Sequence, residues 1–266
     1  MRPRYRDRRG QTEQASATTT KQMHQELANL GGLSCQIVDR LPDQTQPGLV
    51  VVLCHGFGAP GTDLVPLADE LFAIDTKLAD AVRFVFPAAP LSLEAQGMPG
   101  GRAWWPLDVA RFAAAVESGQ VRDLRNDLPA GLPEARQMLT HLIDELLQQT
   151  GLPMSKVVLG GFSQGSMLAT DVTLRVPEPP AALTVFSGTL LCEDKWRPLA
   201  EKRGSLPVLQ SHGYQDPILP YQGAEGLRDL LRDAGMPVEF LPFSGAHTIP
   251  LEALHRFAVM LGDLSA

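Results

Sequence analysis

Short apolar runs alternate with amphipathic stretches along most of the chain. Unbroken apolar runs predict buried strands, and apolar positions spaced by three or four predict helices with one apolar face. Expected strands cover residues 33–39, 49–54, 82–86, 157–160, 181–187, 207–210 and 238–242. Expected helices cover residues 62–74, 109–116, 134–149, 223–234, 250–261 and the stretch that follows Ser163.

Strands that alternate with helices predict the α/β class, with a mostly parallel central sheet and helices on both of its faces. Residues 31–266 show no break in composition, so we expect one domain there. Within it, residues 91–133 form a loop and short-helix insertion. In sheets of this kind, reactive groups gather outside the carboxyl ends of the strands. The insertion and the turns at those ends are therefore where we look for chemistry.

The first twenty residues differ from the rest of the chain. Residues 1–20 are polar, include five arginines and contain almost no large aliphatic side chain. Such a segment cannot bury enough surface to order itself. It also lacks the apolar core of a secretory signal. We expect a disordered basic leader.

Composition excludes several classes of protein. A hydrophobic content of 44% and a charged content of 20% are typical of a soluble globular chain. No apolar run is long enough to cross a bilayer. The net charge of −7 and the absence of a basic stripe in the body of the chain argue against nucleic-acid binding. Three widely separated cysteines indicate a reducing compartment, here taken as the cytoplasm, and neither a disulfide framework nor a metal site.

The pentapeptide Gly161-Phe162-Ser163-Gln164-Gly165 matches Gly-x-Ser-x-Gly between an expected strand and an expected helix. This context is that of a nucleophile elbow, in which a strained turn presents a serine hydroxyl at a helix N-terminus. The alternative is a small-residue turn without chemistry. The elbow requires a base, an acid and oxyanion donors elsewhere in the chain.

His247 is the candidate base, because it follows the last expected strand in a loop of small residues. A serine needs such a base to become a nucleophile at neutral pH. His55 and His212 each precede a glycine at a strand end, and we expect both rings to bind the turn backbone. His141 and His255 lie within expected helices and are interpreted as structural, and His24 lies in or beside the leader.

Asp216 is the candidate acid, because it lies between Ser163 and His247 in sequence and in a tight turn after a strand. Asp194 follows the preceding strand and is the rival, with a solvated helix cap as its ordinary role. For the oxyanion, the backbone N–H of Gln164 lies at the start of the elbow helix. The second donor is expected from the turn that begins at His55, and Phe57 is chosen by position.

From about residue 31 onward, the chain resembles the phospholipase/carboxylesterase group of α/β-hydrolases, which includes the acyl-protein thioesterases. The resemblance rests on motifs that agree in order and spacing: His55-Gly56-Phe57-Gly58, Phe86-Pro87-Ala88-Ala89-Pro90, Trp104-Trp105, residues 161–165, Gly213-Tyr214-Gln215-Asp216-Pro217 and Gly245-Ala246-His247. It implies the α/β-hydrolase fold and a triad of Ser163, Asp216 and His247. It also implies oxyanion N–H groups from Phe57 and Gln164. No metal or cofactor is implied.

The insertion then borders the acyl pocket. Leu91, Met98, Trp104 and Trp105 are the expected apolar walls. The alternative is that the two tryptophans only pack the loop onto the sheet.

The resulting hypothesis is a serine hydrolase of carboxylic esters that works through an acyl-enzyme. Its substrate is a small acyl ester or thioester, with lysophospholipids and acylated proteins in the same class. An acyl-protein thioesterase is the alternative, since Phe57 and Gly58-Ala59 depart from the Leu-Gly-Asp common in eukaryotic thioesterases. An acyltransferase, a dienelactone-type hydrolase and a non-catalytic binding module are further alternatives. No nucleic acid and no stable membrane insertion are expected, and the chain is a monomer or a homodimer.

Overall fold

The computed structural model describes residues 23–107 and 123–266. Within these ranges eight strands form one sheet in the order β1-β2-β4-β3-β7-β8-β9-β10. The strands are β1 (His24–Leu30), β2 (Leu33–Asp39), β3 (Leu49–Cys54), β4 (Val82–Pro87), β7 (Val157–Phe162), β8 (Ala182–Phe186), β9 (Val208–Gly213) and β10 (Val238–Phe243). Only β2 runs against its neighbours, and the pairs from β4 to β10 are parallel. The expected α/β-hydrolase fold, with its mostly parallel sheet, is confirmed.

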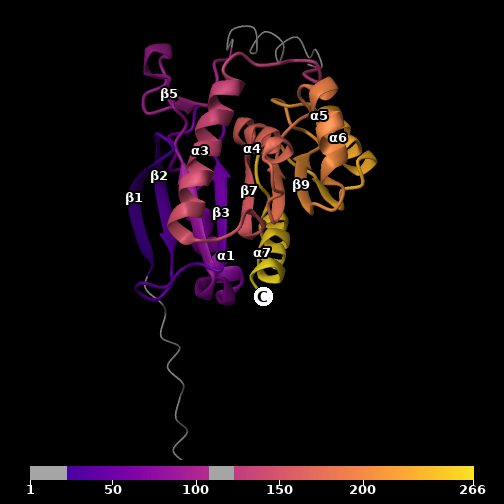
Figure 1. Cartoon of the computed structure of the whole chain (residues 1–266). Helices are drawn as coiled ribbons and strands as arrows, with labels where there is room; N and C mark the ends of the chain where they lie inside the picture. Colours follow the sequence, from indigo (N-terminus) through magenta and orange to yellow (C-terminus); the bar gives the residue numbers. More distant parts are fainter. Residues whose placement is uncertain (1–22, 108–122) are drawn as a thin grey trace, which may run out of the picture.

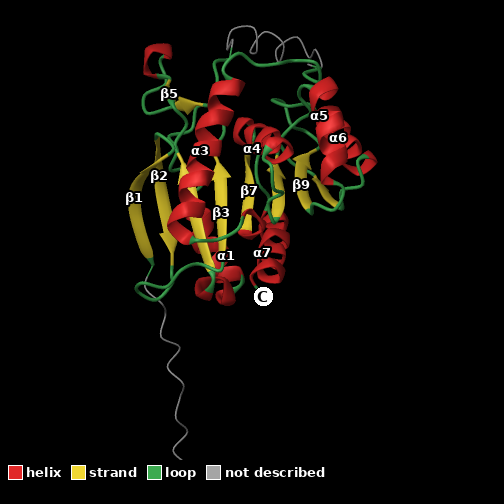
Figure 2. Cartoon of the chain, in the orientation of Figure 1, coloured by secondary structure: helices red, strands yellow, loops and turns green. Residues whose placement is uncertain are grey.

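Helices cover both faces of this sheet (Figures 1 and 2). The α-helices are α1 (Pro66–Ile74), α3 (Leu132–Thr150), α4 (Gln164–Arg175), α5 (Glu193–Ala200), α6 (Tyr221–Asp233) and α7 (Leu251–Ser265). The helices α3 to α6 pack in one apolar layer and α1 and α7 in the other. Short 3₁₀ turns occur at Thr76–Asp80, Glu94–Gln96, Met154–Lys156 and Glu201–Arg203.

The unbroken apolar run of β3 shows why both faces are covered. Val50, Val52 and Cys54 belong to the layer under α3 to α6. Leu49, Val51 and Leu53 belong to the layer under α1 and α7. Successive side chains of a strand point to opposite faces, so a strand between two helical layers has to be apolar at every position.

Three parts of the fold differ from the expectation. The sheet begins at His24, ahead of residue 31, because β1 pairs with β2 across a two-glycine turn. Its exposed, mixed polar pattern is that of an edge strand, which carries little hydrophobic signal. The helix α5 (Glu193–Ala200) contains Pro198 and was not expected. The insertion contains a small hairpin, β5 (Leu91–Ser92) with β6 (Arg102–Ala103). The expected leader over 1–20 and the short helix over 109–116 lie outside the described residues.

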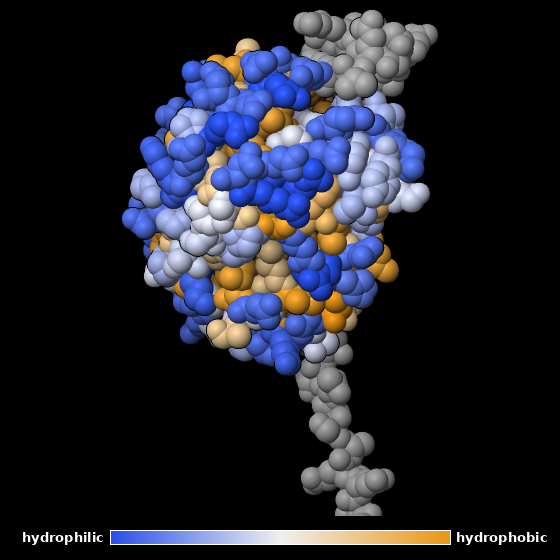
Figure 3. All heavy atoms as spheres, turned by 90° about the vertical axis from the view of Figure 1, so that its right-hand side faces the viewer, coloured by the Kyte–Doolittle hydropathy of each residue, from blue (hydrophilic) through white to orange (hydrophobic). Residues whose placement is uncertain are grey.

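The face of the molecule that carries α6 and β10 has a mixed surface. On the side of α6 and β10, hydrophilic residues dominate and apolar residues lie in separate groups between them (Figure 3). None of the helices in the described ranges is both long enough and apolar enough for a membrane span. Most large apolar side chains of these ranges are instead buried in the two layers beside the sheet.

Candidate active site

Ser163 lies at the sharp turn between β7 and α4, in the backbone conformation expected of an elbow. Its φ is 53° and its ψ is −121°, a region that non-glycine residues rarely occupy. The glycines on either side are required by the neighbouring strand. A Cβ on Gly161 would lie 2.3 Å from the carbonyl oxygen of Cys54, and a Cβ on Gly165 would lie 2.1 Å from it. The turn therefore keeps its shape because β3 leaves no room for side chains there.

Asp216 lies in the turn after β9, where several donors fix its carboxylate. Its Oδ1 accepts the backbone N–H groups of Ile218 at 2.8 Å and Leu219 at 2.9 Å. Its Oδ2 lies 2.7 Å from Nδ1 of His247. Burial raises the pKa of this carboxyl, but hydrogen bonds with His212 and His247 outweigh it and bring the pKa below the usual range. Asp216 is therefore ionised at neutral pH, and its Oδ2 can accept a hydrogen bond from an N–H at Nδ1 of His247.

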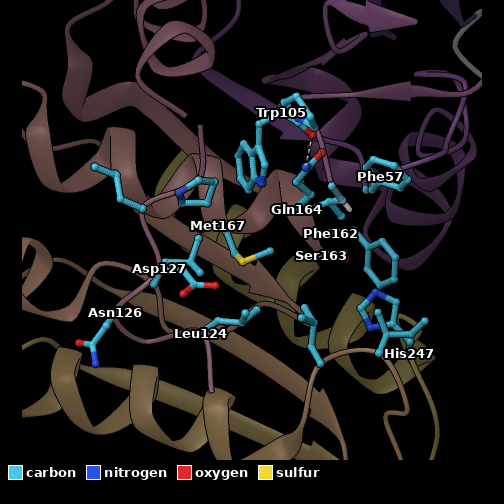
Figure 4. A pocket seen from close by; sticks show the side chains of 18 residues that line it. Phe57, Trp105, Leu124, Asn126, Asp127, Phe162, Ser163, Gln164, Met167 and His247 are labelled. Carbon is cyan, nitrogen blue, oxygen red and sulfur yellow. Dashed lines mark hydrogen bonds between the residues drawn. The ribbon is translucent and has the colours of Figure 1, made fainter. Parts of the chain in front are cut away.

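His247 reaches the same region from the loop after β10. The loop lies close against the end of β9, since a Cβ on Gly213 would lie 2.3 Å from the carbonyl oxygen of Gly245. The imidazole centroid is 4.7 Å from the ring centroid of Phe162, the neighbour of Ser163. His247 and Ser163 both line one cavity (Figure 4). The three residues Ser163, Asp216 and His247 are thus brought together.

The rival acid Asp194 does not reach this region. It lies in the first turn of α5, its side chain is 66% exposed, and its carboxylate contacts the ammonium group of Lys195 at 3.1 Å. Asp194 is therefore a solvated residue at the start of a helix, which is the ordinary role given for it above.

The two residues expected to supply the oxyanion donors line the cavity from different elements. Gln164 is the first residue of α4, where a backbone N–H has no acceptor within the helix. The turn that carries Phe57 lies beside Ser163, because a Cβ on Gly56 would be 3.3 Å from the Ser163 Cβ. Within the described ranges no hydrogen bond uses the Phe57 N–H. Both N–H groups are therefore available near the serine.

His55 and His212 bind turn backbone, as expected, and each also has a second partner. His55 is 1% exposed; its Nδ1 lies 2.7 Å from the carbonyl oxygen of Gly56, and its Nε2 accepts the Ala89 N–H at 2.9 Å. Burial lowers the pKa of His55, which keeps the ring neutral. His212 is fully buried, and its Nε2 lies 2.8 Å from the Leu219 carbonyl oxygen and 3.2 Å from Oδ2 of Asp216.

The contact between His212 and the acid was not predicted. A spacing of four residues between a histidine and a carboxylate across a tight turn was the available signal, but it does not by itself fix the direction of the ring. His212 thus adds a second imidazole at the same carboxylate oxygen that contacts His247.

The cavity over Ser163 has a volume of about 520 Å³ and mostly apolar walls. Its described lining includes Gly56, Phe57, Trp105, Pro106, Leu107, Leu124, Asn126, Asp127, Leu128, Pro129, Phe162, Ser163, Gln164, Met167, Leu191, Ile218, Leu219 and His247. Trp105 and Met167 lie near Gln164, and Leu124 and Asp127 lie toward the end away from His247 (Figure 4). Pockets of this size and character are typical sites for small apolar ligands.

Only one of the four expected wall residues lines this cavity. Trp105 does, whereas Leu91, Met98 and Trp104 lie outside the lining. Leu91 is 38% exposed on β5, and Met98 packs beside Gly58. Trp104 is buried with its indole Nε1 donating to the His55 carbonyl oxygen at 2.9 Å. The two tryptophans lie in the bend that follows β6, and their side chains have different surroundings.

Sequence reasoning missed most of the wall. Met167 lies four residues after Ser163 on α4, so helical spacing gave a signal for it. Ile218 and Leu219 lie two and three residues after Asp216. Leu124 and Leu128 come from an irregular segment whose sequence carries no periodic pattern. The segment is attached to α5 through the N–H groups of Cys192 and Glu193, which donate to the carbonyl oxygens of Asp127 and Arg125.

No group of three or more histidine, cysteine, aspartate or glutamate side chains that could hold a metal ion occurs in residues 23–107 and 123–266. The arrangement over Ser163 consists of a hydroxyl, an imidazole, a carboxylate and free N–H groups beside an apolar cavity. These groups can support nucleophilic attack on a carbonyl carbon.

Comparison with known proteins agrees with this chemistry. Residues 41–261 match the family model described as phospholipase/carboxylesterase. Acyl-protein thioesterase 1 of Eremothecium gossypii is 32% identical over 190 residues, which are 71% of this chain and 75% of that protein. A probable carboxylesterase of Oryza sativa subsp. japonica is 27% identical over 210 residues, 77% and 73% of the two chains. The crystal structure of esterase PE8 superimposes with a TM-score of 0.71 at 31% identity, covering 87% of this chain and 99% of that chain.

Proposed function

Because the chain belongs to the phospholipase/carboxylesterase family, we propose that it hydrolyses carboxylic esters through an acyl-enzyme formed on Ser163. The observation that carries this proposal is the 2.7 Å contact between Asp216 and His247 beside the strained serine of the elbow. That contact orients an imidazole at the cavity that the serine also lines.

In the proposed first half-reaction, Nε2 of His247 accepts the Ser163 proton while Oγ attacks the substrate carbonyl carbon. Asp216 keeps the proton on Nδ1 and stabilises the imidazolium that forms. The tetrahedral oxyanion is stabilised by the N–H groups of Phe57 and Gln164. Collapse of this intermediate expels the alcohol, which takes the proton from His247. Water then repeats the sequence on the acyl-enzyme and releases the acid.

The acyl group is proposed to occupy the apolar cavity beside Trp105 and Met167. The leaving group then lies outside it, toward the solvent. This arrangement accepts alcohols and thiols alike, so the leaving group is the less constrained half of the substrate. Three free, buried cysteines support placement of the enzyme in a reducing compartment, the cytoplasm.

Covalent labelling tests the proposal directly. A fluorophosphonate should modify wild-type protein at Ser163, and Ser163→Ala should lose the label together with several orders of magnitude in kcat. Ser205→Ala is a matched control, since Ser205 is exposed in the turn before β9. Its labelling and kcat should equal those of the wild type. An unlabelled wild-type Ser163 contradicts the proposal.

A second candidate function is thioester hydrolysis on acylated proteins, which the similarity to acyl-protein thioesterase 1 favours. Values of kcat/KM for nitrophenyl and thiol esters, from acetyl to palmitoyl, separate the two. A maximum with short oxygen esters supports the carboxylesterase, and a maximum with long thioesters supports the thioesterase.

A further inference from the structure

The side chain of Gln164 makes two buried hydrogen bonds that the proposed reaction does not use. Gln164 is 1% exposed. Its Oε1 accepts the backbone N–H of Trp104 at 2.9 Å, and its Nε2 donates to the carbonyl oxygen of Trp105 at 2.9 Å. Figure 4 shows the carboxamide directed at the Trp105 backbone, away from the open part of the cavity.

The Gln164 carboxamide supplies the hydrogen bonds that a neighbouring strand would otherwise give to the backbone of Trp104 and Trp105. Trp104 and Trp105 follow β6, and the pairing of β6 with β5 ends at Ala103. In the described ranges no backbone group bonds to the Trp104 N–H or the Trp105 carbonyl. Two buried backbone groups without partners would be costly. The Gln164 carboxamide therefore fixes the segment at the point where the hairpin no longer does.

The segment also connects the elbow to the turn after β3. The Trp104 indole donates to the His55 carbonyl oxygen at 2.9 Å, and its ring centroid lies 5.5 Å from that of His55. Trp105 meanwhile lines the cavity. One side chain of the elbow thus holds both a wall of the cavity and a contact to the turn that carries Phe57.

We propose that the Gln164 side chain is a positioning residue that sets acyl-group selectivity by holding Trp105 as a wall of the cavity. The inference rests on the proposed acyl-enzyme at Ser163. Acyl chains long enough to contact Trp105 depend on the wall, whereas an acetyl group does not. Loss of the carboxamide should therefore reduce the discrimination between acyl groups, beyond any loss common to all esters.

Gln210 provides a matched control for a buried glutamine. It is fully buried on β9, its Nε2 donates to the Ala224 carbonyl oxygen at 2.8 Å, and it does not line the cavity. The same substitution at the two positions removes a buried amide of equal size. A general loss of stability should appear in both variants, and a change in selectivity only at Gln164.

The experiment compares Gln164→Met with Gln210→Met on nitrophenyl esters of increasing acyl length. For Gln164→Met, the ratio of kcat/KM for the best acyl chain to that for acetyl should fall by about fivefold or more. Gln210→Met should keep the wild-type ratio. A disturbed oxyanion N–H would lower kcat/KM by the same factor for every ester and leave the ratio unchanged. A change in the ratio therefore indicates a change in the Trp105 wall.

A double-mutant cycle tests whether Gln164 acts through Trp105. In a Trp105→Ala background, Gln164→Met should change the ratio no further. If Gln164→Met does not fold, Gln164→Glu replaces it, since a carboxylate keeps the acceptor for the Trp104 N–H and loses the donor to Trp105. It should lower the ratio in the same direction.

Fluorophosphonate labelling separates failure of this inference from failure of the proposed function. If wild-type Ser163 is not labelled, the proposed function is overturned and the inference with it. If Ser163 is labelled in every variant and the ratio stays at the wild-type value in the folded Gln164 variant, the inference alone is overturned.

Discussion

The carboxyl ends of β3 and β9 both carry a buried histidine followed by glycine, yet the two histidines bind different groups. His55 directly follows β3, and His212 lies within the last two residues of β9. His55 bonds to two backbone groups, one from Gly56 and one from Ala89. His212 bonds to the backbone of Leu219 and to the carboxylate of Asp216. The same dipeptide at the same edge of the sheet therefore stabilises a turn of neutral groups in one place and a charged group in the other.

The difference follows from what each turn presents to the cavity. The β3 turn contributes the backbone N–H of Phe57. The direction of this N–H is fixed because His55 bonds to the carbonyl oxygen of the same peptide group, that of Gly56. In a peptide group the C=O and N–H point in opposite directions, so a hydrogen bond to Gly56 O turns the Phe57 N–H the other way. The β9 turn contributes a carboxylate, which needs donors around it to stay ionised when buried.

The largest effect is expected when the charge of the β9 turn is removed. Asp216→Asn keeps the shape and the bonds at Oδ1 but leaves His247 without a carboxylate, so kcat should fall by about 10⁴-fold. Asp194→Asn is the control and should keep wild-type kcat, because Asp194 is exposed and bound to Lys195. Steady-state kinetics on one ester decides. Full activity of Asp216→Asn together with a damaged Asp194→Asn variant would reassign the acid.

A smaller effect is expected from the histidine beside that charge. His212→Leu removes a donor near Oδ2 of Asp216, and a hydrogen bond to a charged group is worth about 1.5–3 kcal/mol. We expect kcat to fall by about tenfold to a hundredfold. His212→Gln retains an N–H donor and should recover part of the loss at similar thermal stability. Equal kcat for the Leu and Gln variants would show that the imidazole only fills space.

His55 should instead reveal itself in the pH dependence of stability. Its folded pKa is lowered by burial, so the unfolded chain binds the proton more tightly and stability falls as the pH drops below about 6.5. His55→Asn lacks this contribution, which is at most about 1.4 kcal/mol per pH unit. The difference in unfolding free energy between the wild type and His55→Asn should therefore shrink as the pH is lowered from about 7.5 to about 5.5. Urea unfolding of both proteins measures it; a constant difference contradicts the neutral buried ring.

The smallest effect is expected for Cys54, the residue that precedes His55, and for the other two cysteines. Burial raises the pKa of the Cys54 thiol, and it raises that of Cys35 to about 12 and that of Cys192 to about 11. At about pH 8 these thiols are protonated and poorly nucleophilic. Iodoacetamide should leave native activity unchanged, while all three cysteines react in denaturant. Mass spectrometry checks both states, and rapid native alkylation of Cys54 would show that the β3 turn opens.

Much of the fold could be read from short stretches of sequence. The bounds of β2 and β3 match the apolar runs, and α3 extends the expected helix by only a few residues. The elbow was visible because its glycines and serine are neighbours in the chain. The positions of Asp216 and His247 after β9 and β10 followed from a general rule about the carboxyl ends of parallel strands.

Other features depend on partners distant in sequence. The edge strand β1 is defined by its pairing with β2, since most of its side chains are exposed. The helix α5 contains a proline, and Trp196 on it is held by an indole hydrogen bond to the buried carboxylate of Asp171 on α4. The edge strand leaves no alternating apolar pattern, and in α5 the apolar spacing of Trp196, Leu199 and Ala200 is short and interrupted by Pro198, so neither element was predicted from its own residues.

The sequence by itself determined which residues carry chemistry and at which edge of the sheet they emerge, because periodicity, glycine and strand order are local signals. Only the tertiary structure decided which of two adjacent tryptophans lines the cavity and that Gln164 holds them both. It also decided that His212 reaches Asp216. Those outcomes depend on the direction of side chains across gaps of a few ångströms, which strand register and packing fix and which no local pattern encodes.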